Sequence, residues 1–278
     1  MTKKEFSLPG AEGRPFAVDL RFDPNKENQP VIIFLHGFKG FKDWGHFNLL
    51  ADAFADKGFA YLKFNFSHNG TSVENPTDFV GLDAFGHNTF EKELSDLQTV
   101  LSYIEDSDQL PENIDRNKIY LLAHSRGGAI AIITAAQDNR VKKVATMSSI
   151  SDLEKRFSEK QFSDFEEKGL TEIPNSRTNQ IMPLHRDLID EYRKKNEKLN
   201  ILKNASKLNV PQLIIHAGSD ETVGVDEAKD IQNANPQAEL EIIEGASHVY
   251  GGKHPWDKET LPEHSNRVVE LATAFFGE

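Results

Sequence analysis

Three residues whose side chains can act together as a nucleophile and its base stand at the ends of apolar runs. They are Ser125, Asp220 and His248, and the runs are KIYLLAHS, VPQLIIHAG and AELEIIEG. A serine hydroxyl becomes a strong nucleophile when an imidazole accepts its proton and a carboxylate orients that imidazole. The runs are rich in Val, Ile and Leu and alternate weakly, as is typical of strands buried on both faces. Because parallel strands end at one edge of a sheet, we predict that the three side chains meet there.

The residues around Ser125 predict a strand, a sharp turn and a helix. Gly127 and Gly128 follow the serine and open the run AIAIITAAQ. Glycine is unfavourable inside a regular element, so we interpret the pair as letting the helix approach the sheet without Cβ clashes. The serine hydroxyl would then project from the sheet edge, beside free N–H groups at the start of the helix. The short motif by itself also fits an ordinary strand-to-helix turn.

This arrangement resembles the α/β-hydrolase family, whose G-x-S-x-G turn carries the nucleophile and whose triad follows in the order Ser, Asp, His. The turn reads AHSRG at 123–127 here, with alanine in place of the first glycine. The resemblance implies that Ser125 attacks a carboxylic ester, that His248 transfers the protons and that Asp220 orients the imidazole. It covers nearly the whole chain and points to bacterial esterases of the dienelactone-hydrolase-like and cinnamoyl-esterase-like group. Dienelactone hydrolases use a cysteine nucleophile, and this chain has no cysteine.

The same resemblance implies two backbone donors for the oxyanion of the tetrahedral intermediate. One is the N–H of Arg126, the residue after the nucleophile. The other is the N–H of Phe38 in the stretch VIIFLHGFKG, where the family places a His-Gly-x sequence. We expect the ring of His36 only to brace this loop.

Two of the triad assignments have alternatives. Asp152 also follows an apolar run, at the other position from which relatives supply the acid, although the stretch GSDETV favours Asp220. His254 is near His248 in sequence, but His248 directly follows its run and is preferred. The remaining histidines form no metal-like pair in the sequence, so we expect neither a metal nor a cofactor.

Phe41, Trp44 and Met182 are candidate residues of the substrate pocket. The two aromatic residues belong to the loop after the first buried run, and Met182 lies in a charged segment further along the chain. Each of the three fits a buried packing position equally well.

Strand and helix patterns alternate through most of the chain, which predicts one domain, residues 1–278, built on a mostly parallel, eight-stranded, doubly wound sheet. Residues 151–205 contain no convincing strand and are predicted to form a helical cap insertion, with PNSRT at 174–178 resembling that of the esterase group. The expected strands are 4–8, 14–22, 31–37, 59–66, 118–125, 141–149, 210–218 and 238–245. The expected helices of the main domain are 46–59, 89–106, 127–137 and 266–277.

The charge and hydropathy of the chain limit the classes of binding partner that we expect. The net charge of −12 disfavours binding to nucleic acid or to an anionic membrane surface, and no apolar stretch is long enough for a membrane span. We therefore expect a cytoplasmic protein whose partner is a small-molecule ester, and the oligomeric state stays open. A thioesterase or a peptidase with the same triad, or a non-catalytic binding protein on the same fold, is the alternative function.

Overall fold

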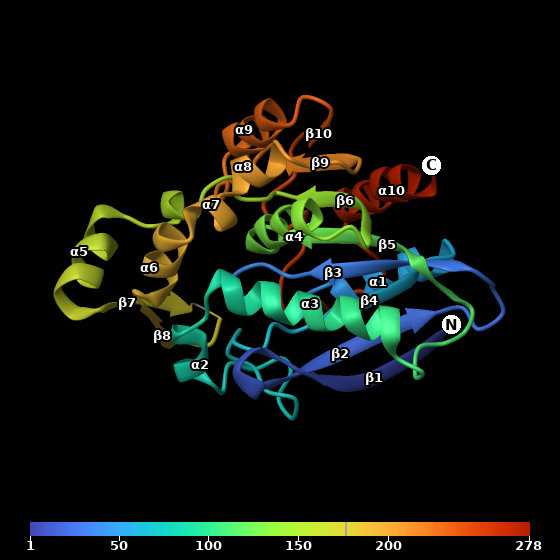
Figure 1. The fold of residues 1–278 in the computed structure, drawn as a ribbon, viewed down its shortest axis with the longest axis horizontal. Coiled ribbons are helices and arrows are strands. Elements are labelled where there is room, and N and C mark those ends of the chain that lie inside the picture. The colour runs from blue at the N-terminus through green and yellow to red at the C-terminus, as the bar shows by residue number, and fades with distance from the viewer. Residues whose placement is uncertain (176) are drawn as a thin grey trace.

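An eight-stranded sheet forms the centre of the computed structural model, which describes residues 1–175 and 177–278 (Figure 1). The strands lie in the order β1-β2-β4-β3-β5-β6-β9-β10, and β2 pairs antiparallel with both β1 and β4, while the other pairs are parallel. Each strand overlaps one of the eight predicted runs, so the predicted fold class is confirmed. The bounds are β1 Thr2–Pro9, β2 Pro15–Phe22, β3 Gln29–Leu35, β4 Ala60–Phe64, β5 Ile114–His124, β6 Val141–Met147, β9 Gln212–Ala217 and β10 Glu239–Ile243.

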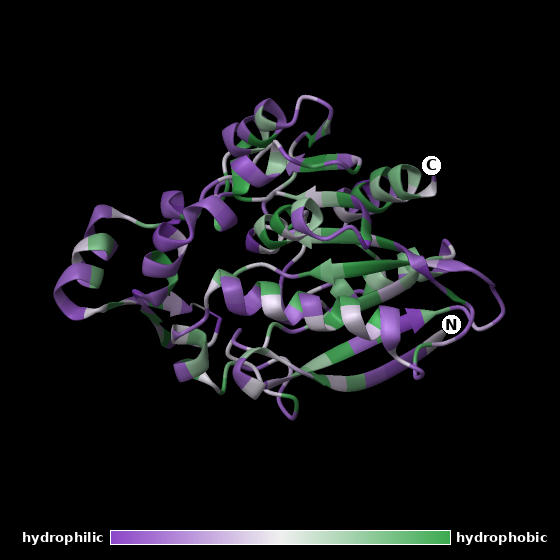
Figure 2. Cartoon of the chain, viewed as in Figure 1, coloured by the Kyte–Doolittle hydropathy of each residue, from purple (hydrophilic) through white to green (hydrophobic). Residues whose placement is uncertain are grey.

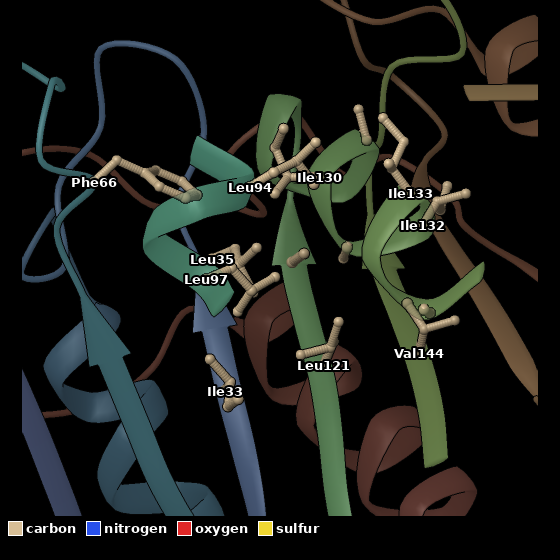
Figure 3. Close-up of a cluster of buried hydrophobic side chains, with 14 of the residues drawn as sticks. Ile33, Leu35, Phe66, Leu94, Leu97, Leu121, Ile130, Ile132, Ile133 and Val144 are labelled. Atoms are coloured by element: carbon tan, nitrogen blue, oxygen red, sulfur yellow. The ribbon is translucent and has the colours of Figure 1, made fainter. Parts of the chain in front are cut away.

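Helices cover both faces of this sheet, and alternate residues of the strands supply the two apolar layers. Ile33 and Leu35 of β3 join one buried cluster, whereas Ile32 and Phe34 join the other, as the two-residue period of a strand requires. Figure 3 shows the first layer, where leucines of α3 and isoleucines of α4 lie over the strands. The helices on this side are α3 Phe90–Asp106, α4 Arg126–Gln137 and α9 Val225–Ala234, and those on the other are α1 Phe47–Asp56 and α10 Glu263–Gly277.

The predicted helices form where their local signals lie. In α3 the side chain of Thr89 accepts a hydrogen bond from the N–H of Lys92, which caps the first turn. Leu94, Leu97 and Leu101 follow at helical spacing and are buried on the face toward the sheet. Hydrophobic residues are concentrated in the central strands, and hydrophilic residues in the outer helices and loops (Figure 2).

The segment 151–205 contains two strands in addition to helices. Leu170–Asn175 (β7) and Gln180–His185 (β8) pair as an antiparallel ribbon, so the expectation of no strand in this segment was wrong. Prolines at 174 and 183 made the strand pattern unrecognisable in the sequence, because proline normally argues against a strand. Proline is tolerated in an edge strand, and both strands of a two-stranded ribbon are edge strands. Leu184, within the segment that we expected to be helical, lies in β8. The helices here are α5 Glu159–Lys168, α6 Asp187–Lys194, α7 Asn196–Leu199 and α8 Ile201–Ala205.

In this segment α5, α6 and the ribbon project beyond the carboxyl ends of the central strands, at the left of Figure 1, while α8 packs against α4 and α9. The ribbon packs beside the short helix α2, Leu82–Gly86. Of the PNSRT stretch singled out above, Ser176 lies outside the described residues. No helix of the described chain has both the length and the hydropathy that crossing a membrane requires.

Candidate active site

Ser125 lies in a strained turn between β5 and α4. Its backbone has φ 54° and ψ −121°, a conformation that is uncommon for residues other than glycine. Its N–H donates to the carbonyl of Met147 at 2.9 Å, which ties the turn to the end of β6. Its carbonyl accepts from the N–H of Gly128 at 2.9 Å, so backbone hydrogen bonds from both its N–H and its carbonyl hold the serine at the carboxyl edge of the sheet.

The two glycines after the serine are required by close packing. A Cβ on Gly127 would lie 2.6 Å from the carbonyl oxygen of His36, at the end of β3. A Cβ on Gly128 would lie 2.5 Å from the Cβ of Ser149, just after β6. Both distances are too short for real atoms, so the interpretation of these glycines as points of close approach is confirmed.

Ser125, His248 and Asp220 form a continuous hydrogen-bonded chain. The Nε2 atom of His248 lies 3.1 Å from the hydroxyl oxygen of Ser125, and its Nδ1 atom lies 2.8 Å from Oδ2 of Asp220. In the tautomer that suits both contacts, Nδ1–H donates to the carboxylate and Nε2 accepts from the serine hydroxyl. The sequence predicted that these three side chains meet at the sheet edge, and the structure brings them together.

The carboxylate of Asp220 is buried, and both of its oxygens accept hydrogen bonds. Its Oδ1 atom accepts from the N–H groups of Thr222 at 2.9 Å and Val223 at 2.8 Å. Burial by itself would raise the pKa of Asp220, but the hydrogen bonds from His248 and these two N–H groups outweigh it and hold the pKa well below its ordinary value. Asp220 is therefore a fixed negative charge next to the imidazole.

The two alternative residues are engaged elsewhere. Asp152 accepts hydrogen bonds from the N–H of Glu154 at 2.9 Å and from the hydroxyl of Tyr192 at 3.5 Å. His254 accepts from the N–H of Gly45 at 2.8 Å and packs against aromatic rings. Neither side chain replaces Asp220 or His248 in the hydrogen-bonded chain.

Two further histidines brace the site, and the role of one of them, His124, was not predicted from the sequence. His124, the second residue of AHSRG, donates from Nε2 to the carbonyl oxygen of His248 at 2.9 Å. Burial, and then the neighbouring His248, lower the pKa of His124 to about 3, so its ring is neutral near pH 7. His36 contacts the carbonyl of Gly37 and the N–H of Phe66 through its two ring nitrogens, the bracing geometry expected of it.

The two residues predicted to supply the oxyanion donors, Phe38 and Arg126, line the larger cavity together with Ser125. Within the described chain, neither the N–H of Phe38 nor that of Arg126 donates to a protein acceptor. The guanidinium of Arg126 points away to Glu93, which it contacts at 3.1 Å, and lies 5.7 Å from the centre of the Phe38 ring. The side chain of Arg126 thus anchors the turn and supports Phe38, and its backbone N–H is free for a ligand.

Two cavities meet at Ser125. One has a volume of about 560 Å³ and the other about 300 Å³, and Ser125, His248, Phe38 and Lys39 line both. The larger cavity is bounded mainly by apolar side chains of the 151–205 segment and its neighbours. Those of the segment itself are Leu153, Phe157, Ile173, Leu184 and Leu188.

Of the three expected pocket residues, Trp44 lines the smaller cavity. Phe41 and Met182 are fully buried and pack in a separate apolar cluster with Phe79 and Phe85. They line neither cavity, so the packing alternative describes these two positions.

A histidine pair that the sequence did not indicate lies elsewhere on the molecule. His87, His185 and Asp187 place their nitrogen and oxygen atoms within 4.8 Å of one another. The two rings stack at 3.9 Å, and Nδ1 of His87 lies 2.5 Å from the carboxylate of Asp187. Such a donor set suits a transition-metal ion. None of the three residues lines either cavity at Ser125, so a cation there would be separate from the serine.

Comparison with known sequences gives a match to one family model and relatives that align over part of their length. The family model for the alpha/beta hydrolase fold matches residues 30–196. The quorum-quenching protein AidA of Acinetobacter baumannii is 26% identical over 123 residues, which are 44% of this chain and 36% of that protein. A protein of Mycoplasma genitalium named "Putative esterase/lipase 2" is 24% identical over 187 residues, 67% of this chain and 58% of that protein. The chain thus spans less than two thirds of the length of these curated relatives.

Solved structures resemble the whole chain in fold. Est1E from Butyrivibrio proteoclasticus, solved with ferulic acid bound, superposes with a TM-score of 0.72 at 20% identity and covers 97% of each chain. The esterase domain of a Rhodothermus marinus protein gives a TM-score of 0.67 at 18% identity over 99% of this chain and 98% of that one. At such identities the likeness concerns the fold.

Proposed function

Because this chain belongs to the alpha/beta hydrolase fold family, we propose that it is a serine hydrolase that cleaves carboxylic esters through an acyl-enzyme. The observation that carries the proposal is the hydrogen-bonded chain from the Ser125 hydroxyl through His248 to the buried carboxylate of Asp220. The esterase names of Est1E and of the Rhodothermus domain support an ester as the substrate.

In this mechanism the oxygen of Ser125 attacks the ester carbonyl carbon while Nε2 of His248 takes the hydroxyl proton. The charge that develops on the carbonyl oxygen is stabilised by the N–H groups of Phe38 and Arg126. The carbon–oxygen bond of the ester then breaks, and His248 gives its proton to the departing alcohol. Water attacks the acyl-enzyme by the same route, returning the proton to Ser125, and Asp220 stabilises the charged imidazole in both halves.

We further propose that residues 151–205 form a cap over the reacting ester. Apolar side chains from this segment bound the larger cavity next to Ser125, which supports a role in holding the substrate and excluding water. The variable part of the ester would then contact the segment rather than the sheet.

The test is an ester panel on the wild type, Ser125→Ala and a matched control, Ser95→Ala, which removes an exposed hydroxyl from α3. We expect Ser125→Ala to lower kcat by about 10⁴-fold or more, because the nucleophile is lost, and Ser95→Ala to match the wild type. A fluorophosphonate should label the wild type and Ser95→Ala at Ser125. Equal rates from all three proteins, or a label on another residue, would remove the proposed nucleophile.

The same panel separates the related activities. Acyl thioesters and aminoacyl amides are included with matched acyl groups, and kcat/KM is compared across the leaving groups. We expect the highest kcat/KM on the esters. Preference for the thioester or the amide would reassign the substrate while keeping Ser125 as nucleophile.

A further inference from the structure

The charges around the two cavities are opposite to those of the whole chain. The net charge of the protein is −12. Among the described residues that line the two cavities, however, there are five lysines and arginines and neither aspartate nor glutamate. A local excess of one sign inside a cleft concentrates ligands of the other sign, whatever the net charge. The five cations are Lys39, Arg126, Lys155, Arg156 and Arg177.

Three of the five are neutralised by carboxylates outside the cavity lining. They are Arg126 with Glu93 at 3.1 Å, Lys155 with Asp230 at 2.8 Å, and Arg156 with Glu227. The structure itself explains these three cations, because a cation in partly apolar surroundings is stabilised by a carboxylate of the protein. The other two cations, Lys39 and Arg177, have no such carboxylate partner among the described residues.

Lys39 is the first of these two. It follows the proposed oxyanion donor Phe38, is half-buried and lines both cavities. Its ammonium contacts the carbonyl oxygen of Pro174 at 3.4 Å, a neutral group. Burial lowers the pKa of Lys39, with no neighbouring charge acting to raise it.

Arg177 is the second and lines the smaller cavity. Its guanidinium lies 5.4 Å from the ring centres of both Phe41 and Phe79. Its Nη2 atom is buried and has no hydrogen-bond partner within the described residues. Among the residues that the structure describes, no carboxylate oxygen lies within 4.0 Å of a side-chain nitrogen of Lys39 or Arg177. Arg177 as a whole is only partly buried and lines the smaller cavity, and a guanidinium without a carboxylate partner can bind one through two parallel hydrogen bonds.

We propose that the substrate carries a carboxylate in addition to its ester, and that Lys39 and Arg177 bind this carboxylate beside Ser125. The inference rests on the proposed function and narrows its substrate class to anionic esters. The smaller cavity, with Trp44 and both cations in its lining, is the place for the charged part of the substrate. The larger, more apolar cavity then takes the other part.

A purely structural role for Lys39 makes a different prediction. If its contact with Pro174 only ties β7 to the loop after β3, removing the ammonium affects neutral and anionic esters equally. The measurement must therefore be a ratio of kcat/KM values between matched esters rather than the rate on one ester.

The experiment uses two matched pairs. The acyl-side pair is 4-nitrophenyl hexanoate and mono-4-nitrophenyl adipate, and the alcohol-side pair is phenyl acetate and 4-acetoxybenzoate. The proteins are the wild type, Lys39→Met, Arg177→Met and Lys142→Met. The last removes an exposed lysine from the amino end of β6, at the opposite end of the sheet from Ser125.

In the wild type we expect the anionic ester of one pair to have the higher kcat/KM. In Lys39→Met and Arg177→Met the anionic-to-neutral ratio for that pair should fall about tenfold or more, because each variant removes a charged hydrogen-bond donor. The neutral ester and Lys142→Met should stay within about threefold of the wild type, the range of an uninvolved surface change. Neutral esters preferred in both pairs, or ratios unchanged in both variants, would overturn the inference while Ser125-dependent hydrolysis still stands.

Failure of the proposed function gives a separate result. If no ester is hydrolysed and the fluorophosphonate does not react, calorimetric titration with two amide analogues, 4-acetamidobenzoate and the mono-anilide of adipic acid, tests the carboxylate site directly. Binding that is weakened about tenfold in Lys39→Met but not in Lys142→Met would support the site. Absence of binding, or equal binding by both variants, would overturn it.

Discussion

Lysines that lie close together in this sequence have opposite surroundings in the structure. Lys63 in β4 is fully buried and contacts Asp19 at 3.0 Å as well as Asp43. Lys39, in the loop after β3, contacts a backbone carbonyl and no carboxylate of the described chain. Lys42, three residues further along the same loop, contacts Asp43 at 2.5 Å.

The comparison separates charges that hold the fold together from charges that are available to a ligand. Lys63 and Lys42 hold the pKa of Asp43 down to about 2 although burial acts to raise it, so the carboxylate stays charged and the group is satisfied internally. Around Lys39 and Arg177 the protein supplies cations and leaves the anion to be provided from outside. The same side-chain chemistry therefore has a structural consequence in one region and a binding consequence in the other.

The largest effect is expected at Asp220, a charged residue that is paired within the protein and also takes part in the proposed reaction. Asp220→Asn is expected to lower kcat by about 10³- to 10⁴-fold, because an amide favours the wrong tautomer of His248. Its matched control is Asp152→Asn, the alternative acid, which should leave kcat near the wild-type value. Steady-state kinetics on one ester measures both. A large loss in Asp152→Asn, with Asp220→Asn active, would move the acid to the other loop.

The direct test of the comparison is the same substitution made in both regions. Lys63→Met leaves Asp19 and Asp43 buried without their shared cation and should lower the free energy of unfolding by about 3–5 kcal/mol. Lys39→Met should change the free energy of unfolding by less than about 1 kcal/mol. Urea denaturation monitored by circular dichroism gives both values. Equal destabilisation by the two variants would show that Lys39 is also a structural cation.

A smaller effect concerns buried groups that stay neutral. Burial lowers the pKa of His36, His46 and His68 to about 4 and that of His124 to about 3. As the pH falls below the ordinary histidine value of about 6.5, the unfolded chain takes up protons that the folded chain does not, so stability falls. Burial raises the pKa of Asp96 to about 7, which acts in the opposite direction because the folded chain holds that proton.

The net expectation is a decrease of about 2 kcal/mol in the free energy of unfolding between pH 7.5 and pH 6. Urea denaturation at the two pH values measures it. In Asp96→Asn the opposing contribution is absent, so the decrease should be steeper by about 1 kcal/mol. A protein that becomes more stable at pH 6 would contradict the assignment of neutral buried histidines.

Much of the fold and the placement of the triad could be predicted because the signals are local. Each of the eight runs became a strand, and the positions of Ser125, Asp220 and His248 after three of them placed their side chains at one edge. The ribbon β7–β8 escaped prediction because its prolines at 174 and 183 contradict the usual strand pattern. The buried positions of Phe41 and Met182 depend on which other side chains fold over them, and no local pattern reports that.

By itself the sequence determined the order along the chain of the strands of the main sheet, the serine turn and the residues that could react, since each depends on residues close along the chain. The tertiary structure decided which charges are paired. Lys39 meets β7 across 135 residues of chain, and Lys63 meets Asp19 between adjacent strands. A net charge is a sum over the whole sequence and carries no information on position. Only folding brings a carboxylate to one lysine and leaves another facing a cavity.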